Sequence, residues 1–110
     1  MQAGLLTGKM SKERLQHMPP GDWRAKGDQF VEPRLSRNLA LQDLVVEIGR
    51  ERDRTAPEVA VAWVLANAAV TGAIVGARRP EQVDGFIGAG EFRLDAAALE
   101  RINTFIRENP

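Results

Sequence analysis

The chain has 110 residues, room for one small domain with a single hydrophobic core. Apolar residues make up 44% and charged residues 27%, and the 15 basic residues balance the 15 acidic ones, so no long-range field attracts nucleic acid or an anionic membrane. The lack of cysteine excludes disulfides and thiolate sites, and no apolar run reaches the length of a membrane helix, so we expect a cytoplasmic protein.

The first ten residues contain two glycines around a short apolar stretch, a composition typical of a loop to which another group can come close. A strand stub near residues 3–6 is the most regular structure that this pattern allows. Ser11 is placed to cap a helical turn that Pro19 and Pro20 end. Residues 11–35 as a whole read as a long loop, in which Trp23 and Phe30 are large enough to pack on a ligand or a partner.

Helical patterns begin at Ser36 or Asn38, where apolar residues recur at the spacing of one helix face, Leu41, Leu44, Val45 and Ile48. Thr55 and Glu58 form a capping box that predicts the start of a second helix. The residues of that helix, EVAVAWVLANAAV, are apolar on nearly every side. We therefore expect it to be covered on more than one side, with Trp63 in the core.

Residues 72–76 are apolar and bounded by glycines, which predicts one clear buried strand of the parallel type. A third helix is expected to begin near Pro80 and to present Val83, Phe86 and Ile87 on one face. Asp95 predicts the start of the last helix, whose apolar face carries Leu99, Ile102 and Ile106.

These patterns predict an α/β fold within one segment, residues 1–110, with a loop at 1–10, the long loop at 11–35 and the order helix, helix, strand, helix, helix over 36–110. A parallel strand needs a neighbour at each edge, and the chain provides only one clear strand. We therefore expect the remaining strands to come from outside the residues of this chain.

Two adjacent arginines, Arg78 and Arg79, follow this strand and precede Pro80. Backbone N–H groups at a helix start bind anions, and guanidinium groups grip phosphate through a planar fork, with Gln82 one turn further as a hydrogen-bonding partner. The alternative is solvated surface, with Arg79 paired to a nearby carboxylate. On these grounds alone the surface interpretation is favoured, because most arginines are exposed.

Other candidate chemistry is sparse. His17 has no nucleophile or orienting carboxylate near it in sequence, so we interpret it as a surface residue. Lys9 could reach an anionic group from the N-terminal loop. The acidic side chains have no spacing that indicates a metal site.

Three stretches, QAGLLTGKM, TAPEVAVAWVLANAAVTGAIVGARRPEQVDG and FRLDAAALERIN, resemble the C-terminal portion of bacterial aldo-keto reductases, in the branch related to potassium-channel β-subunit-like reductases. The resemblance covers nearly the whole chain. It implies the end of a (β/α)8 TIM barrel, with NADP(H) bound at the C-terminal face of the strands.

The resemblance also implies which residues bind the cofactor. The loop from Gln2 to Lys9, including Gly4 and Leu5, would lie along the pyrophosphate. Three residues after the strand, Gly76, Arg78 and Gln82, would contact the 2′-phosphate and ribose. Phe86 stands where the family often has asparagine, with Asp84 as a nearby polar substitute, and Arg79 remains a surface residue.

The resemblance further implies that the catalytic aspartate, tyrosine, lysine and histidine come from the first half of the barrel, outside this chain. The chain has no tyrosine, so the general acid for carbonyl reduction is missing. We expect the NADP-binding segment of an oxidoreductase that reduces aldehydes or ketones, truncated and inactive alone. The alternative is a non-enzymatic protein that self-associates as a homo-oligomer or completes a barrel with a partner chain.

Overall fold

Helices account for all the regular structure of the chain, which a computed structural model describes over residues 1–110. The α-helices are α1 (Lys12–Gln16), α2 (Arg34–Glu51), α3 (Ala56–Leu65), α4 (Pro80–Asp84) and α5 (Ala96–Glu108). Short 3₁₀ helices lie between them: η1 (Gln2–Thr7), η2 (Trp23–Lys26), η3 (Asp28–Phe30) and η4 (Ile87–Gly90). No helix is both long and apolar enough to cross a bilayer.

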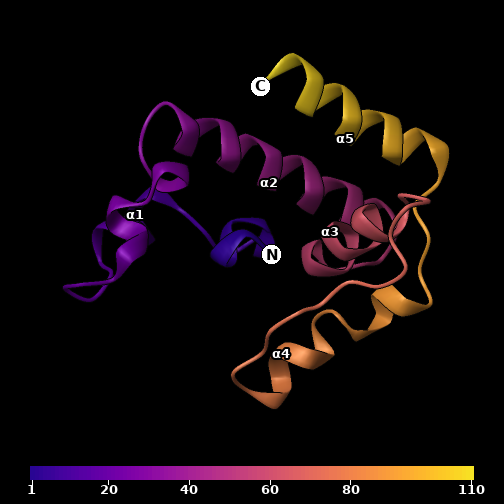
Figure 1. The fold of residues 1–110 in the computed structure, drawn as a ribbon, viewed down its shortest axis with the longest axis horizontal. Helices are drawn as coiled ribbons and strands as arrows, with labels where there is room; N and C mark the ends of the chain where they lie inside the picture. Colours follow the sequence, from indigo (N-terminus) through magenta and orange to yellow (C-terminus); the bar gives the residue numbers. More distant parts are fainter.

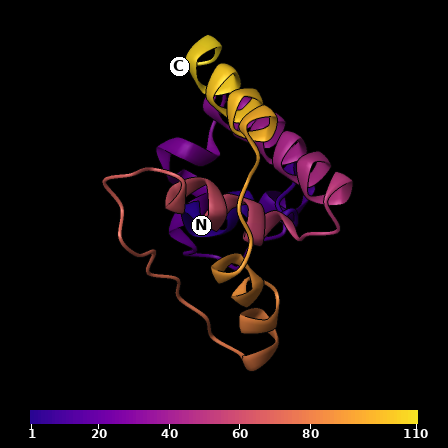
Figure 2. The same cartoon turned by 90° about the vertical axis from the view of Figure 1, so that its right-hand side faces the viewer.

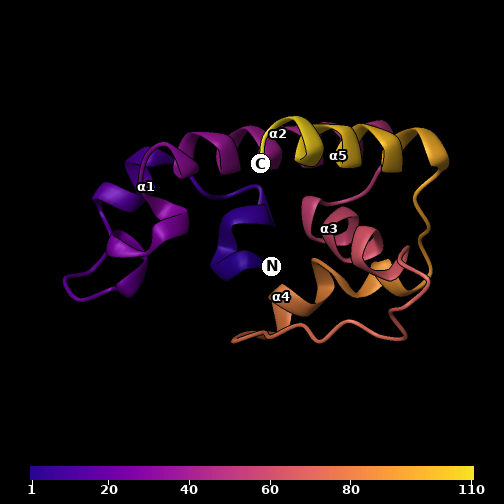
Figure 3. The same ribbon diagram turned by 45° about the horizontal axis from the view of Figure 1, so that its top comes forward.

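The main core lies where α2, α3 and α5 meet. Helices α2 and α5 run side by side, and α3 packs against α2 from below (Figures 1 and 3). The core is made of aliphatic side chains from all three helices and the segment before α5, namely Leu41, Val45, Ile48, Ala56, Val59, Ala60, Ala62, Leu94, Ala98 and Ile102. Burial of these apolar faces against one another is what holds the three helices together.

The predicted caps at Ser11, Thr55 and Asp95 are confirmed, whereas α2 begins at Arg34 and not at the predicted Ser36 or Asn38. Thr55 Oγ1 accepts a hydrogen bond from the Glu58 N–H (3.2 Å), and Glu58 Oε2 accepts one from the Thr55 N–H (2.8 Å), so the capping box is complete. Asp95 Oδ1 accepts from the Ala98 N–H (2.8 Å) at the start of α5. Ser11 likewise caps α1. Each cap satisfies a backbone donor that the helix itself leaves unpaired.

Helix bounds are less accurately predicted than helix caps. Helix α3 ends at Leu65, although the apolar pattern continues to Val70. At this point Asn67 Oδ1 accepts a hydrogen bond from the Ala69 N–H (2.9 Å), a local turn that competes with helix continuation. Helix α4 has only five residues, and Ile87 beyond it is exposed instead of lying on a buried face.

The predicted buried strand at 72–76 is wrong. This stretch is part of a long irregular connection that swings away from the helices between α3 and α4 (Figure 2), and the Ile74 side chain is fully exposed. The expected stub near residues 3–6 is also wrong, because these residues lie in η1. Strands form by pairing, and neither segment has a partner strand within the chain.

Residues 11–35 fold into three short helices instead of one open loop. Phe30 is buried with Leu5 and Met10 in a second, smaller core, and its ring meets that of Trp23 edge to face at 5.8 Å. Trp23 itself is 65% exposed. Phe30 therefore anchors this segment to the protein's own N-terminal region, while Trp23 faces solvent.

Candidate functional site

The N-terminal turn η1 has a backbone that only a glycine-bearing sequence adopts easily. Gly4 has φ 99° and Gly8 has φ 74°, both in the left-handed region. Gln2 and Ala3 also have positive φ, which is uncommon for residues with a side chain. Side chains of neighbouring segments come close to the backbone at Gly4 and Gly8, as the two glycines led us to expect.

Gln42 anchors the end of this N-terminal segment and was missed by the sequence analysis. Its carboxamide donates to the Met10 carbonyl (2.9 Å) and accepts from the Met10 N–H (3.1 Å), and both residues are buried. One side chain on α2 thus satisfies both backbone groups of a residue 32 positions earlier. The only sequence signal was a glutamine on the otherwise apolar face of a helix.

An ion pair within η2 and its N-cap also contacts the N-terminal turn η1. Arg24 donates from Nε to Asp22 Oδ1 (2.9 Å) and from Nη2 to Asp22 Oδ2 (2.6 Å), a two-pronged ion pair. Nη1 of the same guanidinium reaches the Ala3 carbonyl (3.5 Å), so the pair lies against η1. Arg24 hydrogen bonds lower the pKa of Asp22 to about 2, and the positive charge of Arg78 contributes to that shift.

The second predicted half of the cofactor site lies at the end of the connection that follows α3 and in the first turn of α4. Within the second half, Gln82 Oε1 accepts from the Arg78 N–H (2.7 Å), so these two residues are brought together by a direct bond. A Cβ atom built on Gly76 would meet nothing within 4 Å, which leaves its backbone open to a ligand. Neither Arg78 nor Arg79 takes part in any ion pair of the structure.

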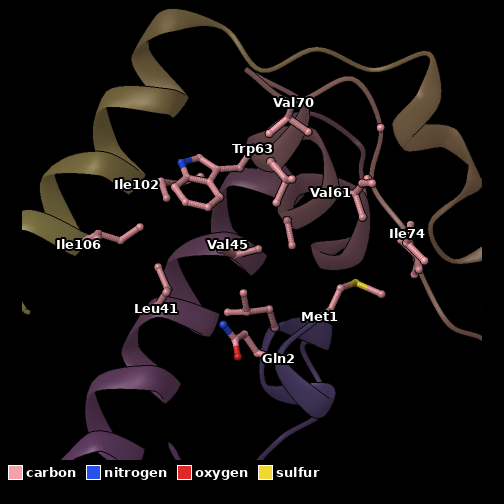
Figure 4. A pocket seen from close by; sticks show the side chains of 16 residues that line it. Met1, Gln2, Leu41, Val45, Val61, Trp63, Val70, Ile74, Ile102 and Ile106 are labelled. Atoms are coloured by element: carbon pink, nitrogen blue, oxygen red, sulfur yellow. The ribbon is translucent and has the colours of Figure 1, made fainter. Parts of the chain in front are cut away.

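The predicted residues of the first half are placed less favourably. The Leu5 side chain is only 2% exposed and packs in the smaller core, so this residue can offer a ligand only its backbone. Lys9 is exposed, and its carbonyl accepts a hydrogen bond from Arg14 (3.2 Å). Gln2 lines an apolar groove (Figure 4).

That groove has a volume of about 570 Å³. Side chains from η1, α2, α3, α5 and the connection after α3 surround it (Figure 4), and 14 of its 16 lining residues are hydrophobic. Trp63 is half-buried: it packs against the main core, as predicted, and also lies on the wall of this groove. Its indole N–H donates to Asn103 Oδ1 (2.9 Å).

The remaining candidates add no reactive centre. His17 is exposed, and its Nδ1 lies 2.8 Å from the Glu13 carbonyl oxygen. Phe86 is half-buried and Asp84 is exposed. No cluster of three or more histidine or acidic side chains could hold a metal ion. The arrangement thus contains a potential anion-binding loop at 76–82 and an apolar groove, but no acid, base or nucleophile poised for chemistry.

Comparison with protein families shows to which family the chain belongs. The model of the aldo/keto reductase family matches residues 1–107. The chain belongs to the aldo/keto reductase family. Members of this family generally use nicotinamide cofactors. The family assignment confirms two expectations: the chain is a helix-rich segment of a barrel fold, and that fold is one of oxidoreductases.

Two relatives show how much of the family fold is present. An uncharacterised oxidoreductase of Bacillus subtilis (strain 168), YrpG, is 34% identical over 103 residues, which are 94% of this chain and 29% of that protein. The solved structure of the glycerol dehydrogenase AKR11B4 from Gluconobacter oxydans is 28% identical, with a TM-score of 0.83 over 98% of this chain and 32% of that chain. This aldo/keto reductase chain therefore spans about a third of the length of these relatives.

Proposed function

We propose that the chain is the NADP(H)-binding C-terminal segment of an aldo-keto reductase of the branch related to potassium-channel β-subunit-like reductases. The observation that carries this proposal is the loop at 76–82. Arg78 and Arg79, which have no ion-pair partners, follow the open backbone of Gly76, and Gln82 is already bonded to Arg78. Positive charge, free backbone and an amide side chain within seven residues fit a phosphate monoester.

In this proposal Arg78 holds the 2′-phosphate, Gly76 allows close approach, and Gln82 keeps the loop in shape. The backbone of Gln2, Gly4 and Leu5, together with the Lys9 ammonium group, would lie along the pyrophosphate. When bound, the cofactor supplies the hydride for reduction of an aldehyde or ketone.

In this proposal the chain contributes cofactor binding but not the general acid that protonates the carbonyl oxygen of the substrate. It contains no tyrosine, and its one histidine is an exposed surface residue, so no general acid is placed to protonate a carbonyl oxygen. We therefore expect no turnover of NADPH with aldehydes by these 110 residues alone. We also propose a reducing, cytoplasmic location, supported by the absence of cysteine.

The experiment that tests the 2′-phosphate site is a nuclear magnetic resonance titration, which detects weak binding. With 2′-AMP, the amide signals of residues 76–82 should shift, whereas unphosphorylated adenosine should leave them unchanged. Arg78→Ala should remove the shifts, and the matched control Arg34→Ala, an exposed arginine on α2, should retain them. Equal shifts in both variants, or none at 76–82 in the unaltered protein, would show that the loop is solvated surface.

A second candidate function follows from the apolar groove. The chain exposes a large apolar hollow and an unpaired connection beside it, and such surfaces are normally covered in a protein assembly. A non-enzymatic protein that buries this groove by self-association, or against a chain that supplies barrel strands, would account for both features. Cofactor binding and association are read by different measurements, so each can fail without the other.

A further inference from the structure

The N-cap residue of α3 makes a contact that capping does not require. Thr55 Oγ1 accepts a hydrogen bond from the Glu58 N–H (3.2 Å), which is the cap itself. The same hydroxyl donates to the carbonyl of Gly85 (2.6 Å), a residue 30 positions further along the chain and the C-cap of α4. A hydroxyl has both a proton to donate and lone pairs to accept. Thr55 therefore begins one helix and holds the end of another.

The segment that follows α4 lies against the same cap. Helix η4 packs beneath α3 (Figure 3), and Ala89 within η4 is only 1% exposed. A Cβ atom at Gly88 would overlap Glu58 Oε1, and the other oxygen of that carboxylate accepts from the Thr55 N–H (2.8 Å). The end of α4 and the start of η4 thus both contact the capping box in the first turn of α3.

Helix α4 connects this contact to the loop at 76–82. The Gln82 N–H donates to the Arg79 carbonyl (3.1 Å), and Gln82 Oε1 accepts from the Arg78 N–H (2.7 Å). Gly85 follows less than one helical turn after Gln82. A helix of five residues is too short to keep its place through its own hydrogen bonds, so its orientation depends on contacts with the rest of the fold. The bond from Thr55 is such a contact.

We propose that Thr55 is a positioning residue for the phosphate site: its bond to Gly85 fixes the orientation of α4 and, through Gln82, the backbone of Arg78. This inference rests on the phosphate site proposed above and names a residue outside 76–82 on which that site depends. Thr55 does not touch the phosphate. It acts because a loop that is already held in place loses less conformational freedom when a ligand binds, which raises affinity.

Titration with 2′-AMP, followed by nuclear magnetic resonance, tests the effect on affinity. Thr55→Val removes the hydroxyl with little change in shape, and the loss of one hydrogen bond predicts a dissociation constant about fivefold higher. Thr55→Ser keeps the hydroxyl and should stay within about twofold of the unaltered protein. The matched control Asp95→Ala removes the corresponding cap bond of α5, to the Ala98 N–H, and should also stay within about twofold. Equal weakening in this control would indicate general destabilisation and overturn the inference.

Amide hydrogen exchange without ligand tests the hold on α4 separately from phosphate binding. The hydrogen-bonded amides of Gln82, Phe86 and Ala89 should exchange about fivefold faster in Thr55→Val than in Asp95→Ala, because only the first variant releases α4. Unchanged exchange, or unchanged 2′-AMP affinity, in Thr55→Val would overturn the inference. Faster exchange in Thr55→Val with no 2′-AMP shifts in the unaltered protein would instead overturn the phosphate site, and with it the effect of Thr55 on affinity, while its hold on α4 would stand.

Discussion

Replacement of Gln42 by leucine tests how the N-terminal segment is held to the helices. Leucine places an apolar side chain of comparable volume on α2 and removes both hydrogen bonds to Met10. The Met10 backbone is buried, so its N–H and C=O groups would lose their partners without gaining water. The perturbation is therefore the loss of two bonds together with the desolvation of two groups left unpaired.

The size of the effect follows from those groups. A buried donor or acceptor left unpaired costs about 1–3 kcal/mol, and partial opening toward solvent relieves part of that cost, so we expect a loss of about 2–4 kcal/mol for the pair. A domain of this size has roughly 5–15 kcal/mol of stability in total. The thermal midpoint should fall by roughly 10–20 °C, since 1 kcal/mol corresponds to several degrees.

Urea unfolding followed by circular dichroism measures this change, with Asp43→Asn as the control on the exposed side of the same helix. The control should change stability by less than about 0.5 kcal/mol. A second variant, Gln42→Glu, separates the two hydrogen bonds, because a carboxylate can accept from the Met10 N–H but cannot donate to the Met10 carbonyl. Its burial favours the protonated form in the folded state, so this variant should lose stability as the pH rises above about 4.3. A loss below about 0.5 kcal/mol in Gln42→Leu would refute the view that this clamp holds the segment.

Two further predictions concern the backbone and the acid range. Gly49→Ala should destabilise the protein by about 1–3 kcal/mol, because the new Cβ would lie 2.5 Å from the Arg54 carbonyl oxygen. The control Gly72→Ala places its Cβ in open space and should change stability by less than about 0.5 kcal/mol. Urea unfolding of both variants measures the difference, and equal effects would contradict the prediction. Because Arg24 lowers the pKa of Asp22 to about 2, this carboxylate stabilises the fold above its unfolded pKa of about 3.9 and loses that effect as the pH falls toward 2. The thermal midpoint should therefore drop over that window, and Asp22→Asn should flatten the drop; an identical pH profile would be the contrary result.

The helix caps show what local sequence can predict. Thr55 with Glu58, and Asp95 with the N–H three residues on, form bonds that need no distant partner, so their outcome could be anticipated from a few letters. The family could be anticipated as well, because the motifs around the glycine-bearing loop and the arginine pair stand in the expected order. The cofactor residues drawn from those motifs remain a proposal.

The sequence by itself determined the helix caps at Ser11, Thr55 and Asp95, the apolar faces of α2 and α5, and membership of the aldo/keto reductase family. Only the tertiary structure decided that residues 72–76 stay unpaired, that Trp63 lines a groove, and that Gln42 clamps Met10. The physical reason is the separation along the chain of the residues that interact. A cap or an amphipathic face depends on residues within one or two turns, whereas a strand depends on a neighbour that this chain does not contain, and a buried amide depends on the backbone that happens to reach it.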